Sequence, residues 1–146
     1  MQGLLRTMRG CVAALATVTA ACSGPTGTGV TDARMAGSWQ YHAATTATST
    51  VIDGVLQLSV SSSGGISGSL DAVESDASGR RTAVTGIVSG SVMAIGSADF
   101  ELALVGGRVR EHITLLRGDS LQGDWIEKQG SSASVTGRFA APRRVP

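Results

Sequence analysis

Cysteine and histidine are scarce in this 146-residue chain, and their scarcity excludes two kinds of site. The only cysteines are Cys11 and Cys22, so no disulfide can form in the rest of the chain, which must hold together by burial and hydrogen bonding. A metal site needs three or four converging ligands. With His42 and His112 as the only histidines, we expect no metal centre, and both fall in the polar phase of predicted strands, where we expect them to be exposed.

A basic excess is also missing. Without Arg6 and Arg9 near the start, 10 basic and 11 acidic residues remain, and no basic stripe runs along the chain. Neutralisation of phosphates requires such a stripe, so nucleic acid is not an expected partner. No Gly-x-Ser-x-Gly elbow is present, and Ser67 and Ser89 lie in strand-like runs, where they are expected to face solvent. We therefore expect a protein that is not an enzyme and carries no cofactor.

The first 21 residues have the pattern of an export signal. Arg6 and Arg9 precede an uncharged apolar run from Cys11 to Ala21, which ends in small residues. The run is about half of the ~20 residues that a membrane-spanning helix needs. Residues 1–21 are therefore predicted to be a cleaved signal peptide and not a permanent anchor.

The residues before Cys22 resemble the lipobox of bacterial lipoproteins. Thr19-Ala20-Ala21-Cys22 places small residues before the cysteine, although the family has Leu, Val or Ile where this chain has Thr19. The resemblance implies lipidation of Cys22, a membrane-lipid partner and a place in the cell envelope, with residues 22–34 as a flexible Gly- and Thr-containing tether. Ordinary secretion is the alternative, because Thr19 and Ala21 also fit the small-x-small cleavage pattern.

From about Met35 onward the apolar residues recur with a period of two, as on one face of a β-strand. Turn signals such as Ser63-Gly64-Gly65 and Gly118-Asp119 follow at short intervals, and Asp53-Gly54 is read as a further turn. The predicted strands are 36–43, 53–61, 65–74, 80–89, 91–96, 98–105, 108–117, 120–128 and 132–140. Eight or nine antiparallel strands in an up-and-down meander are enough to close into a barrel over residues 35–142, followed by a frayed tail at 143–146.

A repeated unit, apolar-x-Gly-x-apolar, favours a barrel over a two-sheet sandwich. The unit places each glycine on the same inward face as its apolar neighbours, where a strand bends strongly or another approaches closely. Its five copies are centred on Gly37, Gly68, Gly86, Gly123 and Gly137.

Gly37-Ser38-Trp39 on the first strand, followed by a glycine-punctuated meander, resembles the up-and-down barrels of the lipocalin and avidin families. The resemblance implies a calycin-type barrel with Trp39 closing its floor. The biotin determinants of avidin do not carry over, because Trp39 and Trp125 are the only tryptophans and the chain has no asparagine.

Candidate ligand contacts are side chains expected to face the barrel interior, namely Trp39, Leu58, Leu102, Glu111 and Trp125. Glu111 falls in phase with Val109 and Ile113, and Glu127 in phase with Trp125. An interior carboxylate would contact a ligand or have a raised pKa. The simpler interpretation places both at the rims or pairs them with Arg108, Arg110 or Arg138.

Two functional hypotheses remain open from the sequence. The barrel either carries a small apolar ligand or is a closed structural or interaction module, inhibitor-like variants included, with an envelope protein as its partner. Nothing in the sequence decides whether the interior is filled or hollow.

Overall fold

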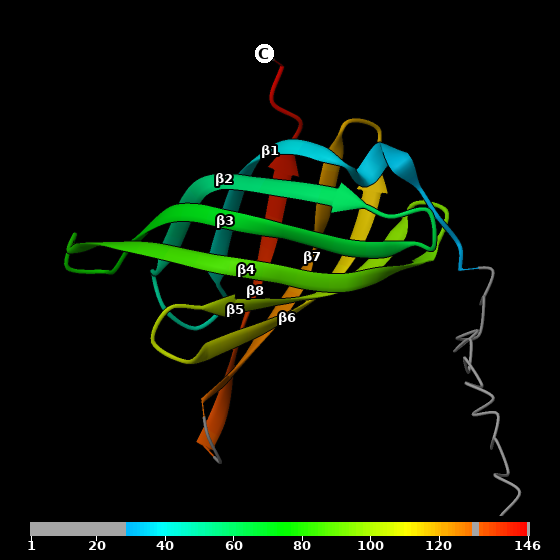
Figure 1. Ribbon diagram of the computed structural model, residues 1–146. Coiled ribbons are helices and arrows are strands. Elements are labelled where there is room, and N and C mark those ends of the chain that lie inside the picture. The colour runs from blue at the N-terminus through cyan, green and yellow to red at the C-terminus, as the bar shows by residue number, and fades with distance from the viewer. Residues whose placement is uncertain (1–28, 130–131, 146) are drawn as a thin grey trace, which may run out of the picture.

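The computed structural model describes residues 29–129 and 132–145, which form a closed antiparallel barrel of eight strands. Each strand pairs with the next along the chain, and β8 pairs with β1 to close the ring (Figure 1). The strands are β1 Gly37–Thr45, β2 Val51–Val60, β3 Gly65–Ser75, β4 Arg81–Ala94, β5 Ser97–Leu104, β6 Arg108–Arg117, β7 Ser120–Gln129 and β8 Ser132–Pro142. This confirms the predicted all-β barrel and excludes the sandwich. Within the described residues no helix is long and apolar enough to cross a membrane.

Two predicted breaks are wrong, and both fall at a glycine inside a strand. The predicted strands 80–89 and 91–96 are one strand, β4, and Asp53-Gly54 lies within β2. A Cβ at Gly90 would lie 2.5 Å from the Cα of Phe100, and one at Gly54 would lie 2.3 Å from the Cβ of Ala72. These glycines therefore permit close contact with the neighbouring strand, a role that sequence alone does not separate from a turn.

The inward-facing glycines of the repeat have a related role. A Cβ at Gly68 would lie 1.9 Å from the carbonyl oxygen of Gln57, and one at Gly123 would lie 1.8 Å from that of Ile113. In both cases the obstructing atom belongs to the adjacent strand and not to the opposite wall. The glycines thus allow the strong strand coiling that closes a narrow barrel.

The interior is filled mainly by apolar side chains that alternate with exposed ones along each strand. On β5 the alternation is complete, because Ala98, Phe100, Leu102 and Leu104 are buried and the residues between them are not. The largest fully buried apolar side chains are Trp39, Trp125, Tyr41, Met35, Ile52, Leu56, Leu70, Leu102 and Leu121. Packing of this set supplies most of the burial that a barrel without disulfides needs.

One end of the barrel is closed by the segments next to both termini, and we call it the terminal end. A short 3-10 helix, η1 (Ala33–Met35), buries Met35, whose carbonyl oxygen accepts a hydrogen bond from Trp39 Nε1 at 3.1 Å. The guanidinium of Arg143 lies 4.1 Å from the centre of the Trp39 ring, and its Nη1 donates to the carbonyl oxygen of Ala36. Trp39 thus packs where the calycin resemblance places a floor.

The same contacts change the expected limits of the tether and of the tail. Asp32, expected within the tether, is buried and accepts a hydrogen bond from the backbone N–H of Gly96 at 2.9 Å. The backbone N–H groups of Arg143 and Arg144, expected in the frayed tail, donate to Asp119 and Ser38. These hydrogen bonds, and the stacking of Arg143 on Trp39, hold the three residues in place. The other predicted tether and signal residues, Cys22 among them, lie outside the described residues.

Candidate ligand-binding site

The side chains of β6 that face the barrel interior are polar, whereas the sequence predicted that Val109, Glu111 and Ile113 face inward. Arg110, His112 and Thr114 are buried, whereas Glu111 and Ile113 face outward. The register with β5 and β7 sets this phase, because His112 is paired with Phe100 and Trp125, whose side chains fill the interior. The expectations that Glu111 faces inward and that His112 is exposed are both wrong.

Glu111 instead belongs to the outer wall. Its side chain is 50% exposed and accepts a hydrogen bond from Lys128 Nζ at 2.5 Å. His42, in contrast, is exposed as expected and lies 2.6 Å from Asp53. Ser67 and Ser89 also face outward, as expected.

A four-membered ion network lies at the end of the barrel opposite the terminal end. Arg110 and Glu127 are each 1% exposed, and Arg110 Nε donates to Glu127 Oε2 at 2.5 Å. Arg108 donates to both oxygens of Glu127, at 2.8 and 3.1 Å, and to Glu74 at 2.9 Å. Arg110 Nη2 also reaches Glu74, at 3.4 Å. Glu127 is therefore inward and paired with Arg108 and Arg110, which confirms the simpler interpretation from the sequence.

One donor of this network is not used. Arg110 Nη1 is buried and, among the described residues, has no hydrogen-bond partner, and the same holds for Thr114 Oγ1. The guanidinium carbon of Arg110 lies 4.4 Å from the centre of the Trp125 ring, so one face of the cation is covered. A buried donor without a partner is costly, so this part of the interior is not optimised for stability alone.

Beyond the ion network, Tyr41 and His112 form a further polar contact in the barrel interior. Since a carbonyl only accepts, the 3.4 Å contact between His112 Nδ1 and the Arg110 carbonyl assigns the proton to Nδ1. Nε2 then accepts from the Tyr41 hydroxyl at 2.9 Å. Phe100 stacks on the imidazole at 4.7 Å, and Phe139 meets it edge-on at 5.1 Å.

Burial is the largest cause of the pKa shifts of both Tyr41 and His112. Burial lowers the pKa of His112 to about 3, with the positive charge of Arg110 acting in the same direction, so the imidazole is neutral near pH 7. Burial also raises the pKa of Tyr41 above its ordinary value, partly offset by the charge of Arg110. On the network itself, the hydrogen bond to Glu127 raises the pKa of Arg108.

The ion network forms the floor of a hollow of about 200 Å³, which we call the mouth. Its lining comes from the end of β1 and the turn that follows it, from the ends of β3 and β7, and from the first residues of β6 and β8. The lining residues are Thr45, Thr48, Thr50, Glu74, Arg108, Arg110, Glu127 and Val135.

Four of the five predicted ligand contacts face the interior as expected, but none of them lines the mouth. Trp39, Leu58, Leu102 and Trp125 are buried among packed core side chains. Of these, Trp125 comes nearest, because Arg110 lies over its ring. Sequence reasoning named Glu127 with Arg108 and Arg110 as its candidate partners, because an inward carboxylate requires a cation on a neighbouring strand. It missed Glu74 and the threonines.

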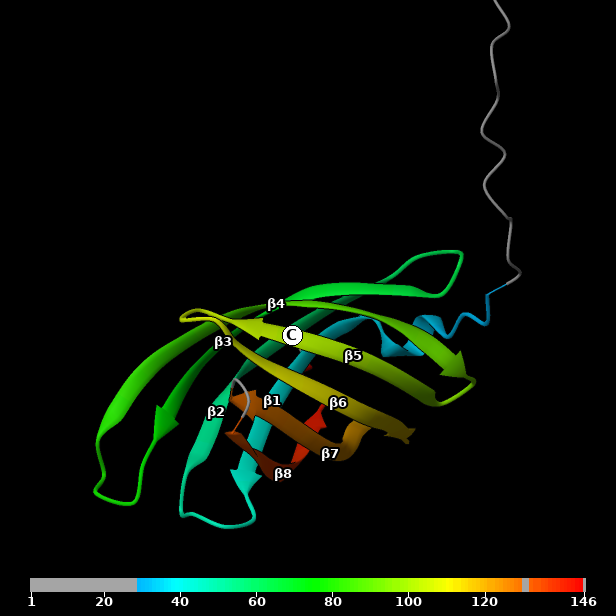
Figure 2. The same cartoon turned by 90° about the horizontal axis from the view of Figure 1, so that it is seen from below.

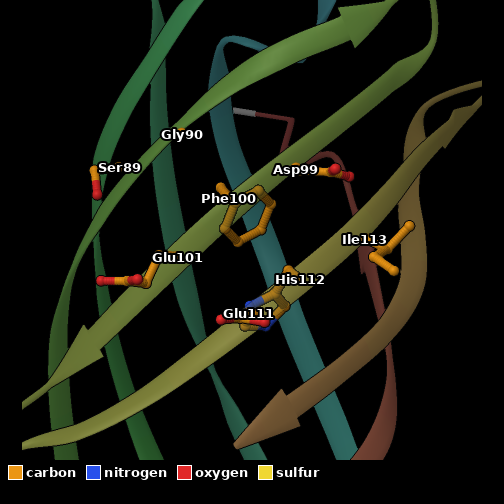
Figure 3. A pocket seen from close by; sticks show the side chains of 8 residues that line it. All are labelled: Ser89, Gly90, Asp99, Phe100, Glu101, Glu111, His112 and Ile113. Atoms are coloured by element: carbon orange, nitrogen blue, oxygen red, sulfur yellow. The ribbon is translucent and has the colours of Figure 1, made fainter.

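A second hollow, of about 460 Å³, lies on the outer wall between β4, β5 and β6 (Figure 3). Phe100 and His112 come from neighbouring strands and lie side by side there, with Glu101 and Glu111 to one side of them (Figure 3). Despite its acidic side chains, the described part of the chain contains no group of three or more residues suited to hold a metal ion.

No family model and no curated protein matches the chain. Solved structures that resemble the chain include EF1p2_mFAP2b bound to DFHBI, with a TM-score of 0.60 and 13% identity over 76% of this chain and 94% of that chain. A redesigned β-barrel, mFAP1, bound to DFHBI has a TM-score of 0.59 and 14% identity over 75% of this chain and 95% of that chain. A de novo designed fluorescence-activating β-barrel has a TM-score of 0.52 and 19% identity over 76% of this chain and 94% of that chain. At these identities the likeness shows the barrel fold alone.

Proposed function

We propose that this protein is a lipid-anchored barrel of the cell envelope that binds a small molecule at its mouth. The observation that carries the proposal is the floor of the mouth, where an ion network built around the buried pair of Arg110 and Glu127 closes a hollow of about 200 Å³. Replacing a buried ion pair by well-packed apolar residues is often neutral or stabilising, so the network is not explained by stability alone.

The lining indicates the chemistry of the ligand. Two arginines, two glutamates and three threonines surround a single apolar residue, Val135. A ligand that presents hydrogen-bond acceptors to the threonine hydroxyls and to Arg108, whose side chain is 35% exposed, fits this lining better than a wholly apolar molecule, the class that sequence patterning favoured. The similar designed barrels bound to DFHBI support the general proposal of a small-molecule-binding barrel.

We propose binding and not catalysis. Tyr41 and His112, the groups best suited to proton transfer, have pKa values shifted away from neutrality in opposite directions. The charges of the mouth are engaged with one another. A general acid or base is most effective when its pKa lies near the working pH, which neither group satisfies.

Native mass spectrometry of protein purified from its own membranes tests the ligand. We expect an extra mass that denaturation releases. Thr50→Trp, which fills the mouth, should remove this mass, whereas the matched Thr85→Trp on the outer face of β4 should retain it. A bare polypeptide mass in the wild type, or an adduct indifferent to Thr50→Trp, would contradict binding at the mouth.

We propose that a lipid on Cys22 anchors the protein, and the direction in which the barrel is oriented fits this anchor. The described chain begins at the terminal end, so a lipid on Cys22 would leave the mouth facing away from the membrane. Labelled palmitate should be incorporated into the wild type and not into Cys22→Ser. Label that persists in Cys22→Ser would refute the anchor and leave ordinary secretion as the alternative.

The closed interaction module remains the second candidate. The observation in its favour is the packing of the interior, where Trp39, Leu56 and Leu102 are 0% exposed. This candidate predicts no released mass in the experiment above and a protein partner captured by crosslinking in the envelope.

A further inference from the structure

The end of β4 and the turn that follows it expose apolar side chains at the terminal end. Met93, in the last residues of β4, is 56% exposed, and Ile95, in the turn, is 77% exposed where turns normally carry polar residues. The neighbouring turns at this end have the polar sequences Ser61-Ser62-Ser63 and Arg117-Gly118-Asp119. Single exposed apolar residues are common on protein surfaces, but Met93 and Ile95, two positions apart at this strand end and turn, form a local apolar tip.

The apolar tip lies beside the segment by which the chain enters the barrel. The backbone N–H of Gly96, next to Ile95, donates to the carboxylate of Asp32 at 2.9 Å. Figure 2 shows the end of β4 beside the segment that leads into η1. Val30, three residues before η1, is exposed as well. A membrane anchor on residue 22 would therefore hold the apolar tip close to the bilayer.

The charges around the tip complement an anionic surface. Two acidic groups of this end are paired, because Asp32 contacts Arg34 and Asp119 contacts Arg143. The exposed Asp99, near the start of β5, is outnumbered by two arginines. Arg117, in the β6–β7 turn, and Arg144, after β8, provide the positive excess. Basic residues near an anionic membrane surface are attracted to it, and apolar side chains enter the region below the headgroups.

We propose that the terminal end docks on an anionic lipid bilayer, with Met93 and Ile95 inserted below the headgroups and Arg117 and Arg144 at the lipid phosphates. The docking rests on the proposed anchoring at Cys22 for its geometry. It adds an orientation, because a barrel docked in this way holds its mouth directed away from the membrane.

Site-specific lipid quenching tests the docking. Protein purified from its own membranes carries an environment-sensitive dye on Ile95→Cys and is placed in vesicles of phosphatidylethanolamine and phosphatidylglycerol that contain spin-labelled lipid. We expect quenching and a blue shift of the dye at position 95. The matched control is Ile87→Cys on the barrel wall, where the side chain is 71% exposed in the native chain and no quenching is expected.

A second comparison isolates the charge. Arg117→Gln should lower the ratio of docked to undocked protein roughly fivefold, the effect of one basic residue at an anionic surface. Arg81→Gln, at the opposite end of the barrel, should leave the ratio unchanged. Vesicles of phosphatidylcholine alone should abolish the difference between Arg117→Gln and the wild type.

The same samples separate failure of the docking from failure of the anchor. Palmitate label on Cys22 with equal quenching at positions 95 and 87 overturns the docking and leaves the anchor intact. Quenching confined to position 95 in protein without palmitate supports the docking and refutes the anchor. Crosslinking of position 95 to a protein, without quenching by lipid, overturns the docking in favour of a protein interface.

Discussion

Replacing Glu127 by glutamine is expected to lower the free energy of unfolding by about 3–5 kcal/mol. The carboxylate accepts hydrogen bonds from Arg108 and from the fully buried Arg110. Without it, the charge of Arg110 is opposed only by Glu74 at 3.4 Å. Chemical denaturation followed by tryptophan fluorescence measures the loss.

A double-variant cycle shows whether the loss comes from the stranded cation. Arg110→Met in the Glu127→Gln background removes the uncompensated charge, and Arg108 keeps its bond to Glu74. The double variant should therefore recover much of the stability that the single variant loses. Additive losses in the double variant would show that the two charges are not coupled.

The exposed pair of Arg138 and Asp124 is the matched control for this cycle. These side chains are 85% and 70% exposed and lie 3.4 Å apart. Breaking that pair with Asp124→Asn should change stability by less than about 1 kcal/mol, because solvent screens it. A loss as large as that of Glu127→Gln would mean that burial does not set the cost.

The second large effect is a fall in stability as the pH is lowered. Burial holds the pKa of His112 at about 3 in the folded protein, against an ordinary value of 6.5. Between these values the unfolded chain binds a proton that the folded chain does not, so protonation favours unfolding. The free energy of unfolding should fall by about 1.4 kcal/mol per pH unit below pH 6.5, on the order of 5 kcal/mol over the whole window.

His112→Gln should flatten this dependence between about pH 6.5 and pH 5, a range above the titration of most carboxyl groups. The comparison is confined to that range because Asp32, whose pKa the hydrogen bond from Arg34 lowers to about 2, destabilises the fold in stronger acid. His42→Gln is the matched control, because this histidine lies on the outer face. Equal slopes for wild type and His112→Gln would contradict a neutral buried imidazole.

The pattern of the sequence was sufficient for most of the strands, apart from the breaks at Gly54 and Gly90, but not for the inward side of β6. Apolar residues alternate cleanly along β5, and the inward phase of Phe100 and Leu102 followed from that alternation. Along β6 the apolar residues Val109 and Ile113 share a phase with Glu111, and this phase faces outward. Burial of Arg110 and His112 becomes evident only from the register with β5 and β7, which local sequence does not specify.

The position and lining of the mouth could not be predicted from the sequence, because they also depend on how distant strands are paired. Its floor combines residues from β3, β6 and β7, and its rim adds threonines from the β1–β2 turn. Glu74 and Glu127 are 53 positions apart in the chain, yet both contact Arg108. Barrel closure brings these groups together, and although the phase of Glu127 indicated an inward carboxylate, nothing in the local sequence of Glu74 separates it from an ordinary surface charge.

The most direct test of binding at the mouth uses the two tryptophans, which lie at opposite ends of the barrel. Trp125 contacts Arg110 beneath the mouth, and Trp39 contacts Met35 and Arg143 at the terminal end. The small molecules released from the denatured wild-type protein are added to Trp39→Phe, in which only Trp125 emits, and to Trp125→Phe, in which only Trp39 emits. The account predicts a saturable change in emission from Trp125 and none from Trp39. A change confined to Trp39, or no change in either protein, would contradict it.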